Sequence, residues 1–242
     1  MAPRNLPSLF SSLARSTSTG TPTRWTLLRT LKSENINDIT GDLHGTVTFT
    51  PLRSPSKTAT PSDSQNGDTG AGNTDLLYSE EGSLPPSFGP GLRWTKKYIW
   101  RLSPEGRISV WFVKVDKSTK ESKEAEADYL FHEFNFDPSS NPDSGSSPNS
   151  SPATSPDSNS ATEFITPPTP PVPMHISATG SDTNTRVITA RGNHLCINDM
   201  YRTAYAFRID EGSGEVLTWA SRHVVRGPKK GQDIVNFYSR AV

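Results

Sequence analysis

Two histidines are the side chains of this sequence best suited to acid–base or ligand chemistry. His132 lies in Phe131-His132-Glu133, on the face of an expected strand that also carries Leu130, Phe134 and Phe136. An imidazole among aromatic side chains either binds or protonates a ligand, or it bonds a neighbouring strand carbonyl as part of the core. Both interpretations stay open at the level of sequence.

His194 and Cys196 form a second candidate group. They lie two residues apart, so on an extended strand both side chains project to one side. Together with His132 they are chemically able to bind zinc. The sequence has no Cys-x-x-Cys or His-x₃-His pair in support, so we expect no metal site, and Cys196 is expected to be a small buried apolar residue. The pattern identifies no cofactor.

Asp199 and Tyr201 follow directly, at the start of another expected strand. Asp199 either bonds backbone N–H groups of the turn or orients one of the two histidines. No serine stands in a Gly-x-Ser-x-Gly motif, so nothing indicates a serine hydrolase.

Aromatic side chains recur at alternate positions of several expected strands. They either line a cavity that takes a flat or acyl ligand, or fill a solid interior. The side chains that we select as a ligand-binding set are Trp100, His132, His194, Tyr201 and Trp219.

A basic cluster surrounds Gly227-Pro228. It consists of Arg222, Arg226, Lys229 and Lys230. Such a cluster either attracts an anionic head group or is a solvated turn. The whole chain has 25 Lys and Arg against 25 Asp and Glu, and the expected strands carry no base-stacking motif, so we expect no nucleic-acid partner.

The composition divides the 242 residues into one domain and three polar stretches. Only 31% of the residues are hydrophobic. The deficit is concentrated in residues 1–23, 53–74 and 138–185, and residues 138–173 alone contain 10 Pro and 10 Ser. We therefore expect an N-terminal tail over 1–23 and one domain over 24–242, interrupted by disordered insertions at 53–74 and 138–185.

Hydrophobicity in the remaining sequence has a period of two. Leu43, Gly45, Val47 and Phe49 share one face, as do Trp94, Lys96, Tyr98 and Trp100, and similar patterns recur along the chain. This periodicity predicts eight or nine strands and no crossover helices. We expect an all-β fold, an antiparallel up-and-down β-barrel, with a two-sheet sandwich as the alternative.

Across this core the sequence resembles a fungal and bacterial domain family of unknown function. The residues that carry the resemblance are Trp25-x-Leu27-x-Arg29, Gly41-x₃-Gly45-x₃-Phe49, Leu77-Tyr78-x-Glu80-x-Gly82, Tyr98-Ile99-Trp100, Phe131-His132, His194-x-Cys196-x₂-Asp199-x-Tyr201-x₃-Tyr205, and Trp219 followed by Gly227-Pro228-x-Lys230 or its neighbour Lys229. The family looks related to calycin barrels, the group of lipocalins, fatty-acid-binding proteins and nitrobindin-like proteins. The resemblance implies a ligand cavity, and a haem-binding histidine by analogy with nitrobindin-like proteins.

The polar stretches suggest further roles. Leu6, Leu9, Phe10 and Leu13 recur at helical spacing and predict a short helix that plugs one barrel end, whereas the absence of acids in 1–23 is also typical of a mitochondrial presequence. We expect a cytoplasmic protein without a membrane span, with nuclear and mitochondrial locations left open. Residues 167–173 form a polyproline segment that either binds a peptide-recognition domain or is neutral.

These observations favour a binding module for a small, partly apolar ligand. Two alternatives remain. One is an enzyme on the same barrel with a His-centred acid–base, haem or metal site, and the other is an interaction protein that acts through the Pro/Ser-rich insertion.

Overall fold

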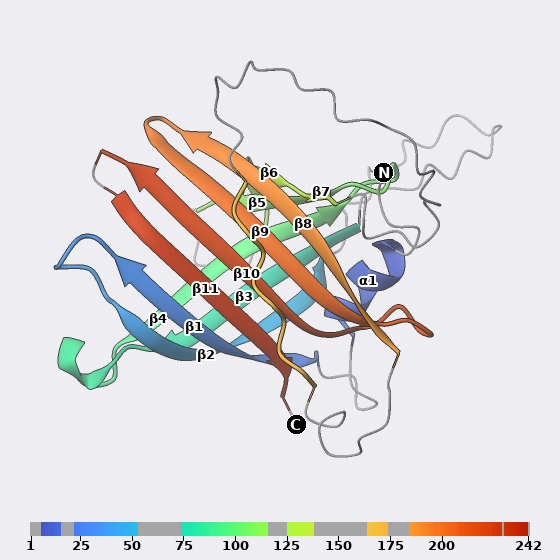
Figure 1. Cartoon of the computed structure of the whole chain (residues 1–242), viewed down its shortest axis with the longest axis horizontal. Helices are drawn as coiled ribbons and strands as arrows, with labels where there is room; N and C mark the ends of the chain where they lie inside the picture. The colour runs from blue at the N-terminus through green and yellow to red at the C-terminus, as the bar shows by residue number, and fades with distance from the viewer. Residues whose placement is uncertain are drawn as a thin grey trace, which may run out of the picture.

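The computed structural model of the chain describes residues 6–15, 22–52, 74–115, 125–137, 164–173, 184–228 and 230–241. These residues form eleven strands, one α-helix and one 3₁₀ turn (Figure 1). In chain order the elements are α1 (Leu6–Leu13), β1 (Arg24–Ser33), β2 (Gly41–Leu52), β3 (Thr74–Ser83), η1 (Pro86–Phe88), β4 (Arg93–Leu102), β5 (Ile108–Val113), β6 (Ala127–Glu133), β7 (Asn135–Phe136), β8 (Thr185–Cys196), β9 (Asp199–Asp210), β10 (Val216–Gly227) and β11 (Lys230–Arg240).

All eleven strands belong to one antiparallel sheet. Their spatial order is β6-β5-β4-β3-β2-β1-β11-β10-β9-β8-β7, so nearly every strand pairs with its neighbour in the chain. The two edge strands, β6 and β7, are consecutive and are separated only by Phe134. The sheet therefore curls into a nearly closed barrel, which confirms the expected all-β antiparallel architecture and removes most of the exposed edge.

The expected number of strands, eight or nine, is wrong. The sequence pattern missed β8. Its inward positions carry Ile188, Ala190 and then Gly192, and two arginines, Arg186 and Arg191, lie in the same stretch. A glycine and two charged residues weaken a period-two signal, although tertiary packing still favours the strand. The stretch from Leu130 to Phe136, expected as one strand, is divided between β6 and β7.

Gly192 allows the barrel to close. A Cβ atom at this position would lie 2.7 Å from the carbonyl oxygen of Glu133 and 2.7 Å from Cδ2 of His132. Real Cβ atoms do not approach a backbone oxygen so closely, so any larger residue would push the end of β6 away from β8. The glycine that hides β8 from the periodicity is thus required at the seam.

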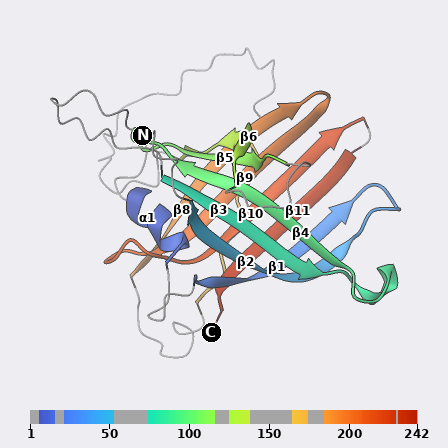
Figure 2. The same cartoon turned by 180° about the vertical axis from the view of Figure 1, so that it is seen from behind.

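The short N-terminal helix is confirmed, and it packs at one end of the barrel (Figure 2). Leu6, Leu9, Phe10 and Leu13 are buried in the main hydrophobic cluster. The indole N–H of Trp25 donates to the carbonyl of Leu13, at 3.2 Å, and so satisfies one of the carbonyls left free at the helix end. This end of the barrel is solid.

Aromatic rings continue the solid packing above the helix. The ring of Trp219 lies parallel to that of Tyr238, with centroids 3.4 Å apart, and packs edge-on against Trp25 and Trp100. Phe49 bridges the same group, with its centroid 5.2 Å from that of Trp100. These rings form a floor across the barrel, and the space beyond it, toward the hairpins that join β3 to β4 and β10 to β11, is not filled.

Ten residues of the Pro/Ser-rich insertion, 164–173, run over the outside of the barrel, in front of β9 and β10 in Figure 1. The hydroxyl of Thr218 donates to the carbonyl of Pro171, at 2.6 Å, and Nε of Arg208 donates to the same carbonyl, at 3.3 Å. Pro170 and Pro173 are buried. We expected disorder throughout 138–185, and these ten residues are held as a strap, while residues 138–163 and 174–183 lie outside the described part.

Candidate functional site

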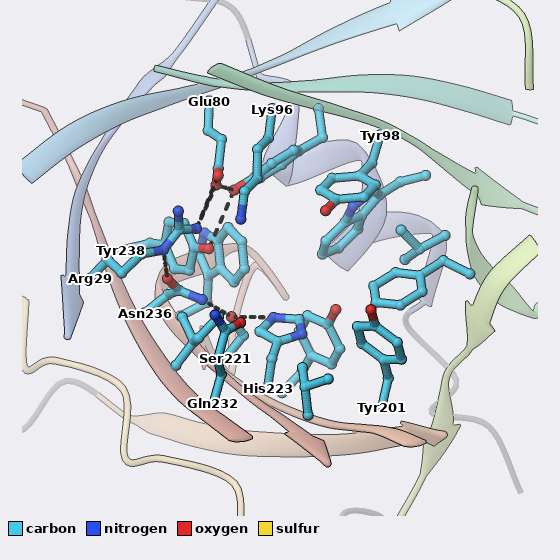
Figure 3. Close-up of a pocket in the computed structure, with 18 residues that line it drawn as sticks. Arg29, Glu80, Lys96, Tyr98, Tyr201, Ser221, His223, Gln232, Asn236 and Tyr238 are labelled. Atoms are coloured by element: carbon cyan, nitrogen blue, oxygen red, sulfur yellow. Dashed lines mark hydrogen bonds and ion pairs between the residues drawn. The ribbon is translucent and has the colours of Figure 1, made fainter. Parts of the chain in front are cut away.

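A cavity of about 170 Å³ occupies the half of the barrel farther from α1. Figure 3 shows the side chains around it. They come from β1, β3, β4, β5, β6, β9, β10 and β11, and comprise Arg29, Tyr78, Glu80, Lys96, Tyr98, Trp100, Val110, Phe131, Tyr201, Tyr205, Trp219, Ser221, His223, Val225, Gln232, Ile234, Asn236 and Tyr238. Lys96 points inward and yet remains exposed, so solvent reaches the cavity from the hairpin end.

A buried ion pair forms one wall. Nη2 of Arg29 lies 3.0 Å from both carboxylate oxygens of Glu80, and its Nε donates to Oδ1 of Asn236 at 2.7 Å. The hydroxyl of Tyr78 donates to the same carboxylate. Burial is the largest single influence on Arg29 and opposes its charge, but Glu80, Tyr238 and Tyr78 together outweigh it, so the pKa of the guanidinium is raised. Glu80 and Arg29 therefore satisfy each other inside the barrel.

The ring of Trp94 packs against the guanidinium of this ion pair. Its ring lies 4.8 Å from Cζ of Arg29, within the range of a cation–π contact. The ring occupies space above Gly45 and Gly82, and a Cβ atom at either glycine would collide with it or with the neighbouring strand's backbone. The two glycines thus leave the space that the ring of Trp94 occupies.

A second polar row crosses β10 and β11. Nδ2 of Asn236 donates to Oγ of Ser221 at 3.0 Å, and Nε2 of His223 lies 3.2 Å from the same oxygen. Burial, with smaller contributions from the positive charges of Lys96 and Arg29, lowers the pKa of His223 to about 3. His223 is therefore a neutral hydrogen-bonding group at neutral pH.

Replacing His223 with asparagine is expected to flatten the acid side of the stability profile. Below about pH 6.5 the unfolded chain takes up a proton at His223, whereas the folded protein does so only near pH 3. Folding stability should fall across that interval, by up to about 1.4 kcal/mol per pH unit for one such group. Urea unfolding of wild type and His223→Asn between pH 7 and 4 measures the difference.

The exposed His44 provides the matched control. His44→Asn should leave the slope of the wild type unchanged. The cations that face His223, Lys96 and Arg29, are present in wild type and in both variants, so they do not account for a difference between the slopes. Identical pH profiles for His223→Asn and wild type would contradict the assignment.

β4 contributes two adjacent inward donors, Lys96 and Tyr98. Figure 3 shows both side chains directed into the cavity. The barrel atoms packed around the side chain of Lys96, followed by the charge of Arg29, lower the pKa of Lys96, although the residue keeps exposed surface at the hairpin end. Burial and the carboxylate of Glu80 raise the pKa of Tyr98 to about 12, so its phenol keeps its proton.

Three of the five residues selected from the sequence line the cavity: Trp100, Tyr201 and Trp219. His132 and His194 are not among the lining residues. His132 is fully buried behind Tyr205, with Nε2 3.0 Å from that hydroxyl, and burial lowers its pKa well below 6.5. His194 is half-buried and packs against Phe131, with ring centroids 5.7 Å apart.

A register irregularity explains the position of His132. Val110 pairs with His132, but the next residue of β5, Trp111, pairs with Leu130, so the regular alternation breaks at Phe131. A bulge of this kind re-aims side chains. Phe131 consequently lines the cavity, His132 sits behind it, and Leu130 is exposed.

The charged lining residues were missed by the sequence analysis. Arg29, Glu80 and Lys96 read as polar positions of strands, and no spacing relates them, because Arg29 and Glu80 are 51 residues apart. A signal did exist: Lys96 shares its face with Tyr98 and Trp100, and charged residues on an aromatic face are expected to point inward.

Asp199 and the described residues of the basic cluster do not line the cavity, and they pair with one another or with neighbouring side chains. Nζ of Lys230 lies 2.8 Å from Oδ2 of Asp199 and donates to the hydroxyl of Tyr201 at 2.9 Å. Arg222 and Arg226 pair with Asp233 and Glu34. The basic cluster is therefore largely neutralised, and Lys229 lies outside the described residues.

The part of the chain that the structure describes contains no cluster of metal-ligating side chains. No group of three or more His, Cys, Asp or Glu side chains there could hold a metal ion. Cys196 is a free, half-buried thiol.

The fold and the site together define an antiparallel barrel, plugged at one end, with an aromatic and polar cavity in the other half. The chain belongs to a family of unknown function, DUF6314, whose model matches residues 22–155 and 173–240. The matched segments include every residue that lines the cavity and omit most of the strap at 164–173. No curated protein and no solved structure matches the chain. None of the described helices is long and apolar enough to cross a membrane.

Proposed function

We propose that this protein binds a small, partly apolar molecule in the barrel cavity. The observation that carries the proposal is the division of the interior: the half next to α1 is packed solid, whereas the other half holds a cavity with an aromatic floor and hydrogen-bonding walls. Binding sites for small molecules combine apolar linings with a few fixed polar groups in this way. A calycin-type relationship agrees with the proposal.

The size of the cavity favours a compact ligand. Drug-sized ligands occupy pockets of roughly 300–1,000 Å³, whereas an apolar cavity of about 150 Å³ holds a benzene molecule. A cavity of about 170 Å³ therefore fits a ligand with one ring better than a long acyl chain. Trp100 and Trp219 present flat faces and edges against which such a ring packs.

Among the described lining residues, Ser221 and His223 form the one contact between a serine and a histidine. We interpret this pair as part of a binding site and not as a catalytic pair. Ser221 and His223 are within hydrogen-bonding distance, but a histidine with a pKa of about 3 is a poor proton acceptor at neutral pH. Asn236 also donates to Ser221, so the hydroxyl is held as a structural link.

A peptide partner for residues 167–173 would have to compete with the barrel. The carbonyls of Pro170 and Pro171 already accept hydrogen bonds from Arg208, and Pro171 also accepts one from Thr218. We therefore place the function in the cavity.

The tryptophan indole N–H signals test the proposal. In ¹H–¹⁵N spectra of the full chain, we expect benzyl alcohol or benzoate to shift the signals of Trp100 and Trp219, which line the cavity. Trp111 provides an internal control, because its indole donates to Ser109 and it does not line the cavity. The shifts should saturate with increasing probe.

A variant that fills the cavity completes the experiment. Ile234→Phe adds a ring to a lining residue and should abolish the saturable shifts, whereas Thr95→Phe adds the same ring to an exposed position of β4 and should not. Equal shifts at Trp111 and Trp100, or undiminished binding to Ile234→Phe, would contradict cavity binding.

A further inference from the structure

Two hydrogen-bond donors on β4 face the cavity without an acceptor. Lys96 and Tyr98 are two residues apart on the same face, and both side chains point into the cavity (Figure 3). Neither Nζ of Lys96 nor the hydroxyl of Tyr98 makes a hydrogen bond or ion pair with any residue that the structure describes. Lys96 is exposed and Tyr98 is half-buried, so water, or a ligand that enters the cavity, is free to accept hydrogen bonds from both.

Glu80 is the one carboxylate among the described lining residues, and both of its oxygens already accept hydrogen bonds. Glu80 lies directly opposite Lys96 in the β3–β4 register, which is the usual place for a cross-strand ion pair. Both of its oxygens instead accept from Nη2 of Arg29, and one also accepts from Tyr78. Lys96 therefore forms no ion pair with any residue that the structure describes, although the carboxylate of Glu80 still acts on its charge.

The charges of the lining residues consequently do not cancel. Arg29 and Glu80 neutralise each other, and His223 is neutral at neutral pH. The remaining titratable lining residues are Tyr78, Tyr98, Tyr201, Tyr205 and Tyr238, which are uncharged phenols. Among the lining residues that the structure describes, Lys96 is therefore the one cation without an ion-pair partner.

We infer that the cavity binds a small aromatic carboxylate, with its carboxylate on Lys96 and Tyr98 and its ring against Trp100 and Trp219. The inference rests on the proposed function and specifies its ligand class. A carboxylate supplies one negative charge and two acceptor oxygens, which match one ammonium and one neighbouring phenol.

Other head groups match less well. A phosphate monoester carries nearly two negative charges and three acceptor oxygens at neutral pH, more than one free cation balances. An amine would place a third cation beside Lys96 and Arg29. A neutral alcohol would leave the charge of Lys96 unpaired.

Three probes of one shape and different charge test this inference: benzoate, benzyl alcohol and benzylamine. Their dissociation constants are measured at pH 7.0 on the full chain by the indole shifts of Trp100 and Trp219. We expect benzoate to bind about 10–100-fold more tightly than benzyl alcohol, as expected for a charge-assisted hydrogen bond, and benzylamine to bind most weakly.

Lys96→Met removes the charge and keeps an unbranched side chain. It should weaken benzoate by about 10–100-fold and leave benzyl alcohol unchanged, and Tyr98→Phe should weaken benzoate by about 2–10-fold. Lys97→Met, on the exposed outer face of β4, is the matched control and should bind all three probes as the wild type does. Thermal unfolding of each variant confirms that the fold is retained.

The outcomes separate the two proposals. Equal affinities for benzoate and benzyl alcohol, unchanged by Lys96→Met, would overturn the carboxylate inference and leave cavity binding in place. Tightest binding of benzylamine would also overturn it. If none of the three probes shifts the indole signals, both the inference and the proposed function for single-ring ligands fail.

Discussion

Replacing Glu80 with alanine is expected to lower the free energy of unfolding by about 3–5 kcal/mol. The carboxylate is 3% exposed and is the only acceptor that the described residues offer to Nη2 of Arg29, which is itself 6% exposed. Removing it leaves a guanidinium without its counter-charge inside the barrel and takes one of two hydrogen-bond partners from Tyr78, whose hydroxyl also lies 3.3 Å from that of Tyr238. Breaking a buried ion pair from one side is far more destabilising than replacing both partners.

Urea unfolding at pH 7 measures this loss of stability. Two further variants show whether the buried ion pair is its cause. Glu81→Ala, at the next position of β3, removes an exposed carboxylate that pairs with Arg93 at the surface, and should change stability by less than about 1 kcal/mol. The double variant Arg29→Met/Glu80→Leu replaces both charges by apolar groups and should recover much of the loss. A double variant as unstable as Glu80→Ala would show that the ion pair is not the cause.

Replacing Trp219 with alanine is expected to destabilise the barrel by about 3–5 kcal/mol and to enlarge the cavity. Trp219 is 1% exposed, stacks on Tyr238 and contacts Trp25, Phe49, Trp100 and Phe207. It also lines the cavity, so its removal opens the aromatic floor toward α1. The variant should therefore gain affinity for a two-ring carboxylate such as 2-naphthoate.

Unfolding curves and indole shifts give the two readouts for Trp219→Ala. The control is Trp111→Ala, because Trp111 is half-buried and does not line the cavity. It should lose less stability and should bind 2-naphthoate as the wild type does. A floor that collapses after truncation would leave 2-naphthoate binding unchanged, and that outcome would contradict an enlarged cavity.

The architecture could be predicted because alternation along a strand follows directly from burial of one face. Trp25 and Leu27, Val47 and Phe49, and Tyr98 and Trp100 all point inward as the periodicity requires. The helix over Leu6–Leu13 was also visible as a helical spacing of apolar residues. Strand β8 was not detected from the periodicity. Closure of the barrel requires a glycine at position 192, where the alternating pattern of a strand would have an apolar side chain.

The site was less predictable, because it depends on which strands become neighbours. Arg29 on β1 contacts Glu80 on β3 across the intervening strand β2. Their cross-strand neighbours on β2 are Leu43 and Val47, two apolar residues that give no indication of an ion pair. The bulge at Phe131 exchanged the positions of Phe131 and His132 relative to the cavity. The aromatic lining followed from alternation alone, and the polar lining followed from sheet order and local irregularity.

The aromatic floor couples occupancy of the cavity to the stability of the whole barrel. Trp100 and Trp219 belong both to the cavity lining and to the cluster that buries α1. A compound that binds only the folded protein raises the free energy of unfolding by about 2.7 kcal/mol when its free concentration is about 100 times its dissociation constant. Metabolite libraries can accordingly be screened by melting temperature alone, without an assay for activity.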